Sequence, residues 1–182
     1  MTKPLPLITY PNPLLKQISK PVEQINESIR QLVEQMFVTM YREGGIGLAA
    51  VQVGVLLRVI VCDLSYEIKH HHHSGPCNHD LQIINSSKKC FINPIITDFS
   101  QEKSICKEGC LSFPNLRADV SRPKTVTVSY LDIDGKQCIE QLTDLDATCI
   151  QHEIDHLNGI VFVDYLSKIK QKMLLNKLKK HG

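Results

Sequence analysis

The stretch His152-Glu153-Ile154-Asp155-His156 constrains this chain more than any other, because its chemistry requires a helix. On a helix, residues four apart stand on one face, with about 5–6 Å between their Cβ atoms, so His152 and His156 can reach one metal ion. The carboxylate of Glu153 can then lie beside a water bound to that ion. The pattern predicts a helix with a water-activating metal site, although HExxH also arises by chance in ordinary amphipathic helices.

Composition narrows the class of protein. The chain has 182 residues, of which 42% are hydrophobic and 22% charged, which is typical of one globular domain with a sizeable core. No apolar run approaches the ~20 residues of a membrane span, and the first residues resemble neither a signal peptide nor an arginine-rich transit segment. The seven cysteines follow no disulfide spacing, so reduced thiols in a cytoplasmic protein are expected.

The charge is distributed unevenly. Residues 165–182 contain six lysines and no acid, so the rest of the chain carries 15 basic and 19 acidic side chains. A basic tail on an acidic body indicates either an anionic partner or the solvated lysine face of a terminal helix.

Apolar periodicity predicts the principal elements. Residues spaced three and four apart predict a helix over 26–43, with Asn26 as its N-cap and Gly44-Gly45 as its stop. Runs at 57–64 and 89–96 predict buried strands, and 125–130 and 136–142 predict a hairpin that turns at Asp134-Gly135.

The C-terminal third is expected to be helical. Asp144 is the predicted N-cap of the histidine helix, and Asn158-Gly159 its end. Val161–Val163 is predicted to be a short strand, and Asp164 to cap a last, lysine-rich helix. The apolar stripe expected on that helix consists of Leu166, Ile169, Met173, Leu174 and Leu178.

Residues 66–80 stand apart, because they hold four consecutive histidines, His70–His73, and little to bury. We predict an exposed loop inserted between two strands, and a second functional metal site there is not expected. The fold class expected for residues 1–182 is a single α+β domain, in which antiparallel or mixed sheets pack around a central metal-bearing helix, with one helix near each end of the chain.

The histidine helix needs a third ligand, and the solutions of HExxH proteases fit poorly. No glutamate follows Glu153, and Phe162 stands where the longer motif HExxHxxGxxH has its third histidine. Asp164 is better explained as a helix cap. A cysteine thiolate remains as the third ligand. Cys110 is a candidate, because it lies in the segment EGCLS at 108–112 and follows a glycine that lets another backbone approach closely. Spacing alone does not select it among seven cysteines, and a small buried core residue is the plain alternative.

A glycine-rich stretch, GIGLAAVQ at 45–52, follows the first predicted helix. Gly45, Gly47 and Ala50 match a loose dinucleotide-binding fingerprint, but that fingerprint must follow a strand, so we reject it. The stretch instead predicts an extended segment that brings Gln52 toward the site, where its amide can donate to a developing oxyanion. A surface glutamine in a plain loop is the alternative.

Three motifs in this order, GIGLAAVQ at 45–52, EGCLS at 108–112 and QHEIDH at 151–156, resemble those of the peptide deformylase family. The resemblance implies a hydrolase that removes the N-formyl group from the initiator methionine of new polypeptides and releases formate. It implies that Cys110, His152 and His156 bind the metal. An HExxH endopeptidase and an inactive metal-binding docking module are the alternatives.

The resemblance also implies roles for other residues. Glu153 is the implied general acid and base, and Gln52 and the backbone N–H of Leu111 the implied oxyanion hole. The resemblance further implies that the backbone of the substrate peptide pairs with the segments Gly45–Gly47 and Gly109. Leu145 and Cys149 share the helical face of His152 and, with Ile46, can line an apolar slot for methionine, although core packing also explains them.

One thiolate and two imidazoles accept Zn²⁺, Fe²⁺, Co²⁺ or Ni²⁺. The resemblance implies Fe²⁺ in the cell, with zinc often found after purification. It also implies that the lysine-rich terminal helix docks near the ribosomal exit tunnel, where phosphate-rich RNA suits its charge. Neither DNA nor membrane is an expected partner.

Overall fold

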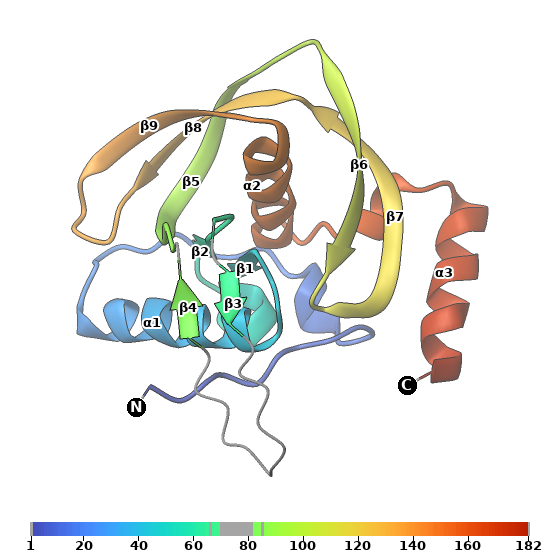
Figure 1. Ribbon diagram of the computed structural model, residues 1–182, viewed down its shortest axis with the longest axis horizontal. Coiled ribbons are helices and arrows are strands. Elements are labelled where there is room, and N and C mark those ends of the chain that lie inside the picture. Colours follow the sequence, from blue (N-terminus) through green and yellow to red (C-terminus); the bar gives the residue numbers. More distant parts are fainter. Residues whose placement is uncertain (1, 66, 70–81, 85, 182) are drawn as a thin grey trace.

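The computed structural model describes residues 2–65, 67–69, 82–84 and 86–181 (Figure 1). Its α-helices are α1 (Glu27–Arg42), α2 (Asp144–Leu157) and α3 (Lys168–His181), and its short 3-10 helices are η1 (Pro13–Lys16), η2 (Ala50–Val53) and η3 (Phe162–Tyr165). The strands are β1 (Gly47–Ala49), β2 (Val59–Cys62), β3 (Glu67–Lys69), β4 (Gln82–Ile84), β5 (Lys89–Phe99), β6 (Lys103–Cys110), β7 (Phe113–Pro123), β8 (Thr125–Leu131) and β9 (Gln137–Thr143).

The named strands of the described residues pair antiparallel throughout. A five-stranded sheet has the order β1-β2-β5-β8-β9, while β6 pairs with β7 and β3 with β4 in separate ribbons. Helix α2 lies between the five-stranded sheet and the β6–β7 ribbon, and it contacts both (Figure 1). The predicted α+β class, with antiparallel sheets around the histidine helix, is confirmed.

Helix α1 follows its sequence pattern. The Asn26 side chain accepts a hydrogen bond from the backbone N–H of Ile29 (3.2 Å), which satisfies one of the free donors at the helix start. The helix ends before Gly44, whose φ of +69° a glycine adopts without strain. Its predicted apolar stripe packs against β1 and β2 in the core.

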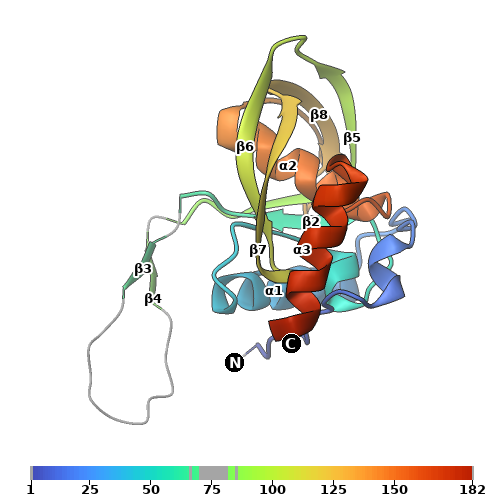
Figure 2. The same ribbon diagram turned by 90° about the vertical axis from the view of Figure 1, so that its right-hand side faces the viewer.

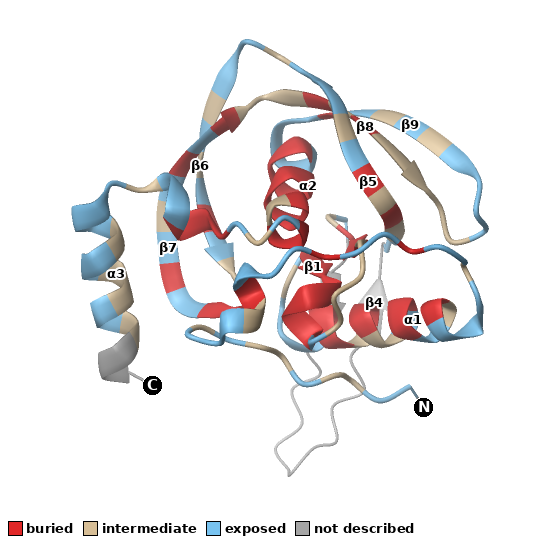
Figure 3. Cartoon of the chain, turned by 180° about the vertical axis from the view of Figure 1, so that it is seen from behind, coloured by how far each residue is buried: buried red, intermediate tan, exposed pale blue. Residues whose placement is uncertain are grey.

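Helix α2 is buried along most of its length, which explains why its apolar periodicity is weak (Figure 3). One side packs on the five-stranded sheet, and the other faces β7. The predicted N-cap was one residue late: Asp144 is the first helical residue and Thr143 occupies the cap position without a side-chain hydrogen bond. The predicted end at Asn158-Gly159 is confirmed.

The β8–β9 hairpin is also as predicted. Its register runs from Thr125 opposite Thr143 to Leu131 opposite Gln137. Gly135 has a φ of +80° in the turn, a conformation that glycine permits.

The region after α2 differs from the prediction. Val161–Val163 was predicted as a strand, but Phe162–Tyr165 forms the 3-10 helix η3. Asp164 does not cap the last helix, because its carboxylate accepts from the backbone N–H of Val161 (2.9 Å) and pairs with Lys16. The last helix begins later, at Lys168.

The apolar stripe of α3 was only partly right. Leu174 and Leu178 pack against the core beneath β7, as predicted. Leu166 packs there too, but it was wrongly assigned to the helix, since it follows η3 and lies before α3 begins. Ile169 and Met173 were predicted in the same stripe, yet they remain 75% and 68% exposed. The packed residues thus occupy one face, and these two apolar side chains share the other with Lys168, Lys170, Lys172 and Lys177.

The predicted loop at 66–80 lies largely outside the described residues, which include neither His70–His73 nor Asp80. Within it, Glu67–Lys69 forms β3 and pairs with β4, so the first part of that segment was wrongly assigned to a loop. The β3–β4 ribbon projects away from the remaining fold (Figure 2).

Asp63 joins the two sides of this insertion. Its buried carboxylate accepts hydrogen bonds from Tyr41 (2.7 Å), from Ser65 and Ser87 (3.1 Å each) and from Ser86 (2.6 Å). Burial alone would raise the pKa of Asp63, but these hydrogen bonds outweigh it and lower the pKa to about 2. The chain therefore leaves and rejoins the sheet at one polar anchor. No helix in the described ranges is long and apolar enough to cross a membrane.

A candidate metal centre and active site

Three side chains converge beside α2. His152 and His156 are one turn apart with ring centroids separated by 5.0 Å, and Cys110 approaches them from the end of β6. The Cys110 Sγ lies 3.2 Å from the His156 Nε2, and the ligand atoms of all three residues lie within 4.8 Å of one another. The predicted set is thus assembled from two distant parts of the chain.

Strand alternation positions the thiol. Cys106, Glu108 and Cys110 are alternate residues of β6, and each contacts a side chain of α2. The register shifts between Gly109 and Cys110, where the ribbon approaches its turn. This places Cys110 at the strand end, directly over the two imidazoles.

The donor set fits a divalent metal ion. The His152 Nδ1 pairs with the Glu108 Oε2 at 2.8 Å, so its Nε2 remains for a metal, in the manner of carboxylate-oriented histidine ligands. Cys110 supplies a soft sulfur donor, and the set of one thiolate and two imidazoles suits Zn²⁺ or Fe²⁺. Three protein ligands leave a coordination position for water.

A buried ionic network holds Glu108, and the sequence did not reveal it. Arg122 on β7 donates to both oxygens of Glu108 (2.5 and 3.1 Å) and to Asp155 (2.8 Å). Tyr165 donates to the same Asp155 oxygen (2.9 Å), and its ring lies 4.8 Å from the guanidinium. Burial raises the pKa of Glu108, but His152 and Arg122 more than offset it, so the carboxylate stays ionised.

Glu153 is buried beside the ligands with 5% of its surface exposed. Its Oε2 has no hydrogen-bond partner among the described residues. Burial raises its pKa to about 7. A divalent cation at the neighbouring ligands would favour the ionised form, so the carboxylate is available to take a proton.

Gln52 faces the thiol from η2. Its Oε1 accepts from the backbone N–H of Ala49 (2.8 Å), which turns its Nε2 toward the Ser112 Oγ (3.2 Å) and the Cys110 Sγ (3.5 Å). The amide therefore presents fixed N–H donors beside the candidate metal ligands. This position agrees with the predicted orientation of Gln52 and excludes the surface-loop alternative, since Gln52 is 1% exposed.

A pocket of about 650 Å³ opens onto these groups. All the predicted substrate-binding residues line it, as does Leu111: Gly45, Ile46, Gly47, Gly109, Leu145 and Cys149. At Gly47, an added Cβ would lie 2.8 Å from both the Cys149 Sγ and the Glu153 Oε1, so a side chain there would fill the space between pocket and helix.

Other lining residues were absent from the prediction, because they carry no motif. They include Glu43, Cys106, Lys107, Phe113, Pro114, Asn115, Leu116, Arg117 and Thr148. Most belong to β6 and β7, whose alternation could have placed them once the ribbon was known.

Comparisons with known proteins point to one family. A family model described as polypeptide deformylase matches residues 4–172. The peptide deformylase of Erythrobacter litoralis is 48% identical over 184 residues, which cover 96% of this chain and 95% of the relative. The crystal structure of peptide deformylase from Ehrlichia chaffeensis in complex with actinonin has a TM-score of 0.84 and 42% identity, and covers 98% of each chain. A plant peptide deformylase structure has a TM-score of 0.83 at 31% identity, covering 99% of this chain and 90% of that one.

Proposed function

Because the chain belongs to the polypeptide deformylase family, we propose that it hydrolyses the N-formyl group of the initiator methionine of newly made polypeptides and releases formate. The observation that carries this proposal is the convergence of one thiol, two imidazoles and a buried carboxylate at the pocket. The cytoplasm is the proposed site of action, which the free thiols of the six described cysteines support.

In this proposal Cys110, His152 and His156 hold one divalent ion. When bound, such an ion would act as a Lewis acid and would lower the pKa of a bound water to about 7. We propose Fe²⁺ in the cell, and Zn²⁺, Ni²⁺ or Co²⁺ as replacements in purified protein, since this donor set accepts each of them.

The proposed catalytic residues move protons and stabilise charge. Glu153 takes one proton from the water as the water oxygen attacks the formyl carbon. It then passes this proton to the leaving nitrogen as the C–N bond breaks. Gln52 Nε2 and the backbone N–H of Leu111 donate to the oxygen that becomes negative. The second proton of the water passes from the formic acid to the amine, so formate and a methionine ammonium group are the products.

The proposed substrate position follows the pocket walls. The peptide backbone pairs with the Gly45–Gly47 and Gly109 segments, while the methionine side chain enters a slot beside Leu145 and Cys149. The Cys149 Sγ lies 3.9 Å from the Ile46 carbonyl oxygen, so these two walls of the slot contact each other.

Metal removal tests the proposal. We expect anaerobically purified protein to release formate from formyl-Met-Ala-Ser, to lose this activity after chelation, and to regain it with Fe²⁺. Formate release and internal peptide cleavage are measured in the same samples. Internal cleavage without formate would indicate an endopeptidase, and a metal-loaded protein inactive in both assays would indicate a docking module; either result contradicts the proposal.

The Gln52→Ala substitution is expected to lower kcat by about 10²–10³, because losing one oxyanion donor typically costs ~2.7–4 kcal/mol. Metal content should stay unchanged, since Gln52 is not one of the three ligands. Single-turnover kinetics and metal analysis of the same preparation measure both quantities.

Ser112→Ala is the matched control, because it removes a neighbour of the same amide but leaves the amide in place. We expect this substitution to lower kcat by at most about tenfold, which corresponds to the net free energy of one neutral hydrogen bond. Equal losses in the two variants would assign Gln52 a structural role.

We also propose that α3 docks on ribosomal RNA. Four of its lysines are exposed on the face that does not pack on β7: Lys168, Lys170, Lys172 and Lys177. Their change to glutamine removes four cations, so we expect ribosome co-sedimentation to weaken at least tenfold while peptide turnover is unchanged.

The control changes four exposed lysines elsewhere to glutamine: Lys3, Lys20, Lys103 and Lys136. The net charge of the two variants is then equal. If both variants co-sediment equally well, the docking proposal is wrong.

A further inference from the structure

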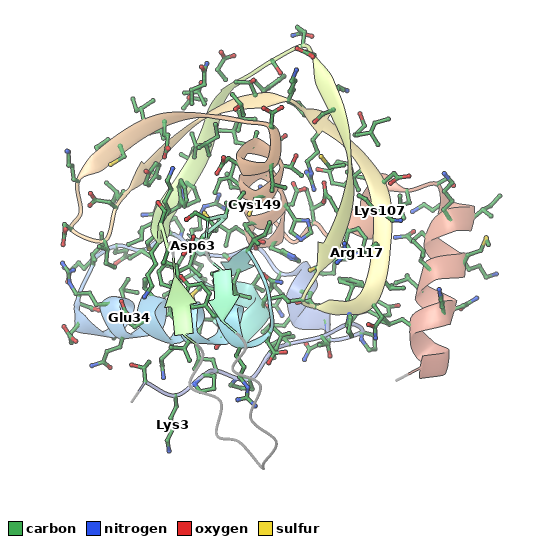
Figure 4. The ribbon with its side chains drawn as sticks, in the orientation of Figure 1. Lys3, Glu34, Asp63, Lys107, Arg117 and Cys149 are labelled. Atoms are coloured by element: carbon green, nitrogen blue, oxygen red, sulfur yellow. The ribbon has the colours of Figure 1, made fainter. Side chains whose placement is uncertain are left out.

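The β6–β7 ribbon presents a cationic face beside the pocket. Lys107 on β6 and Arg117 on β7 are exposed, and both line the pocket (Figure 4). Arg117 stands opposite Gly109, and a Cβ on that glycine would lie 3.5 Å from the Arg117 Cγ. The arginine therefore lies across the glycine that the proposed substrate backbone approaches.

Within the described part of the chain, no ion pair neutralises these two cations. The salt bridges of the described residues include neither Lys107 nor Arg117. Asp119 lies opposite Lys107 in the strand register, and Glu43 reaches the pocket from the end of α1. The other two pocket carboxylates are buried: Glu108 bonds to His152 on α2, and Glu153 belongs to α2 itself. Among the described residues, the outer face therefore keeps an arginine without an ion pair next to its lysine.

The direction of the substrate follows from the proposed function. The formyl group must lie at Cys110, where β6 ends, and the pocket extends back along β6 to Cys106 and Lys107. Because β7 occupies one edge of β6, a peptide can add only to the other edge, running antiparallel from Cys110 toward Lys107.

Side-chain alternation then places each substrate residue. The methionine must point toward α2 to enter its slot, on the side faced by Cys106 and Glu108. Successive side chains of a strand point to opposite faces, so the second and fourth residues point to the outer face. Arg117 and Lys107 occupy that face.

We infer that Lys107 and Arg117 select formylated peptides with carboxylate side chains at the second and fourth positions. This selection rests on the proposed deformylase function and adds a preference that the metal site cannot supply. Each exposed charge pair changes kcat/KM by a factor of about 1.4 to 5. The glutamate peptide gains two attractions and the lysine peptide suffers two repulsions, so we expect the ratio of their kcat/KM values to be about ten.

The test compares two C-terminally amidated peptides, formyl-Met-Glu-Ala-Glu and formyl-Met-Lys-Ala-Lys. At low ionic strength we expect kcat/KM to favour the glutamate peptide about tenfold, and this ratio to approach one in 1 M salt, where the Debye length is about 3 Å. The double variant Lys107→Gln/Arg117→Gln should bring the low-salt ratio to within about twofold of one.

Lys103→Gln is the matched control, because Lys103 is exposed on the same face of β6 but outside the pocket. It should retain the wild-type ratio. Formyl-Met-Ala-Ala-Ala-amide separates the two proposals: failure of wild type to hydrolyse it overturns the deformylase function itself. If this neutral peptide is hydrolysed, a wild-type ratio near one, a ratio insensitive to salt, or equal loss in Lys103→Gln overturns the charge selection.

Discussion

Glu153→Gln is expected to lower kcat for formyl-Met-Ala-Ser by about 10²–10⁴, the usual contribution of a positioned acid–base group. The amide matches the carboxylate in shape but cannot accept and return a proton. The variant should bind its metal normally, because the three ligands are untouched. It should unfold at no lower temperature, because a neutral amide of the same shape replaces a carboxyl group whose ionised form is disfavoured by burial. Formate release over time measures kcat, metal analysis measures the bound ion, and calorimetry measures the unfolding temperature.

Asp146→Asn provides the control for this substitution, because Asp146 is an exposed acid on the same helix. It should retain wild-type turnover. A Glu153→Gln protein with full metal content and more than a tenth of the wild-type kcat would remove Glu153 from the mechanism.

Arg122→Met is expected to destabilise the fold by ~3–5 kcal/mol, because it leaves the buried Glu108 carboxylate without its cation. That loss is a large part of the ~5–15 kcal/mol by which typical domains are stable. Since Glu108 orients His152, metal affinity should also fall, by about 10–100-fold. Urea unfolding and competition with a chelating dye measure the two effects.

Two further variants separate charge from shape. Arg30→Met removes the same side chain from an exposed pair with Asp134 and should cost less than about 1 kcal/mol. Adding Glu108→Gln to Arg122→Met removes the stranded charge and should restore part of the stability, though not the orientation of His152. A loss in Arg122→Met no larger than that in Arg30→Met would show that the network contributes little.

The sequence predicted those parts of the fold that local patterns encode. Helix α1 and the β8–β9 hairpin have strong periodicity together with a capping asparagine and a turn glycine, so both were found. At Val161–Val163 three apolar residues resembled a strand, but Asp164 bonds back to Val161 and closes a 3-10 turn instead. Such a short apolar run does not distinguish the two structures.

The site shows the same division. His152, Glu153 and His156 could be predicted because they share a single helical turn. Cys110 was selected by family resemblance, since its contact with His156 spans 46 positions and leaves no local pattern.

No local sequence pattern indicated that Arg122 is part of the site. It is a buried cation on β7, a strand in which most of the polar side chains are exposed. Its partners Glu108 and Asp155 become its neighbours only after β6, β7 and α2 have packed. Residues of this kind require the three-dimensional structure.

The Asp63 anchor has a consequence for how the chain tolerates extra sequence. The carboxylate hydrogen-bonds to Ser65 on one side of the insertion and to Ser86 and Ser87 on the other, so the core itself holds the two ends together. With the ends fixed, closure entropy changes slowly, by about 0.6 kcal/mol for each doubling of the intervening length. We therefore expect this junction to accept additional sequence with little loss of stability and without a change in the pocket.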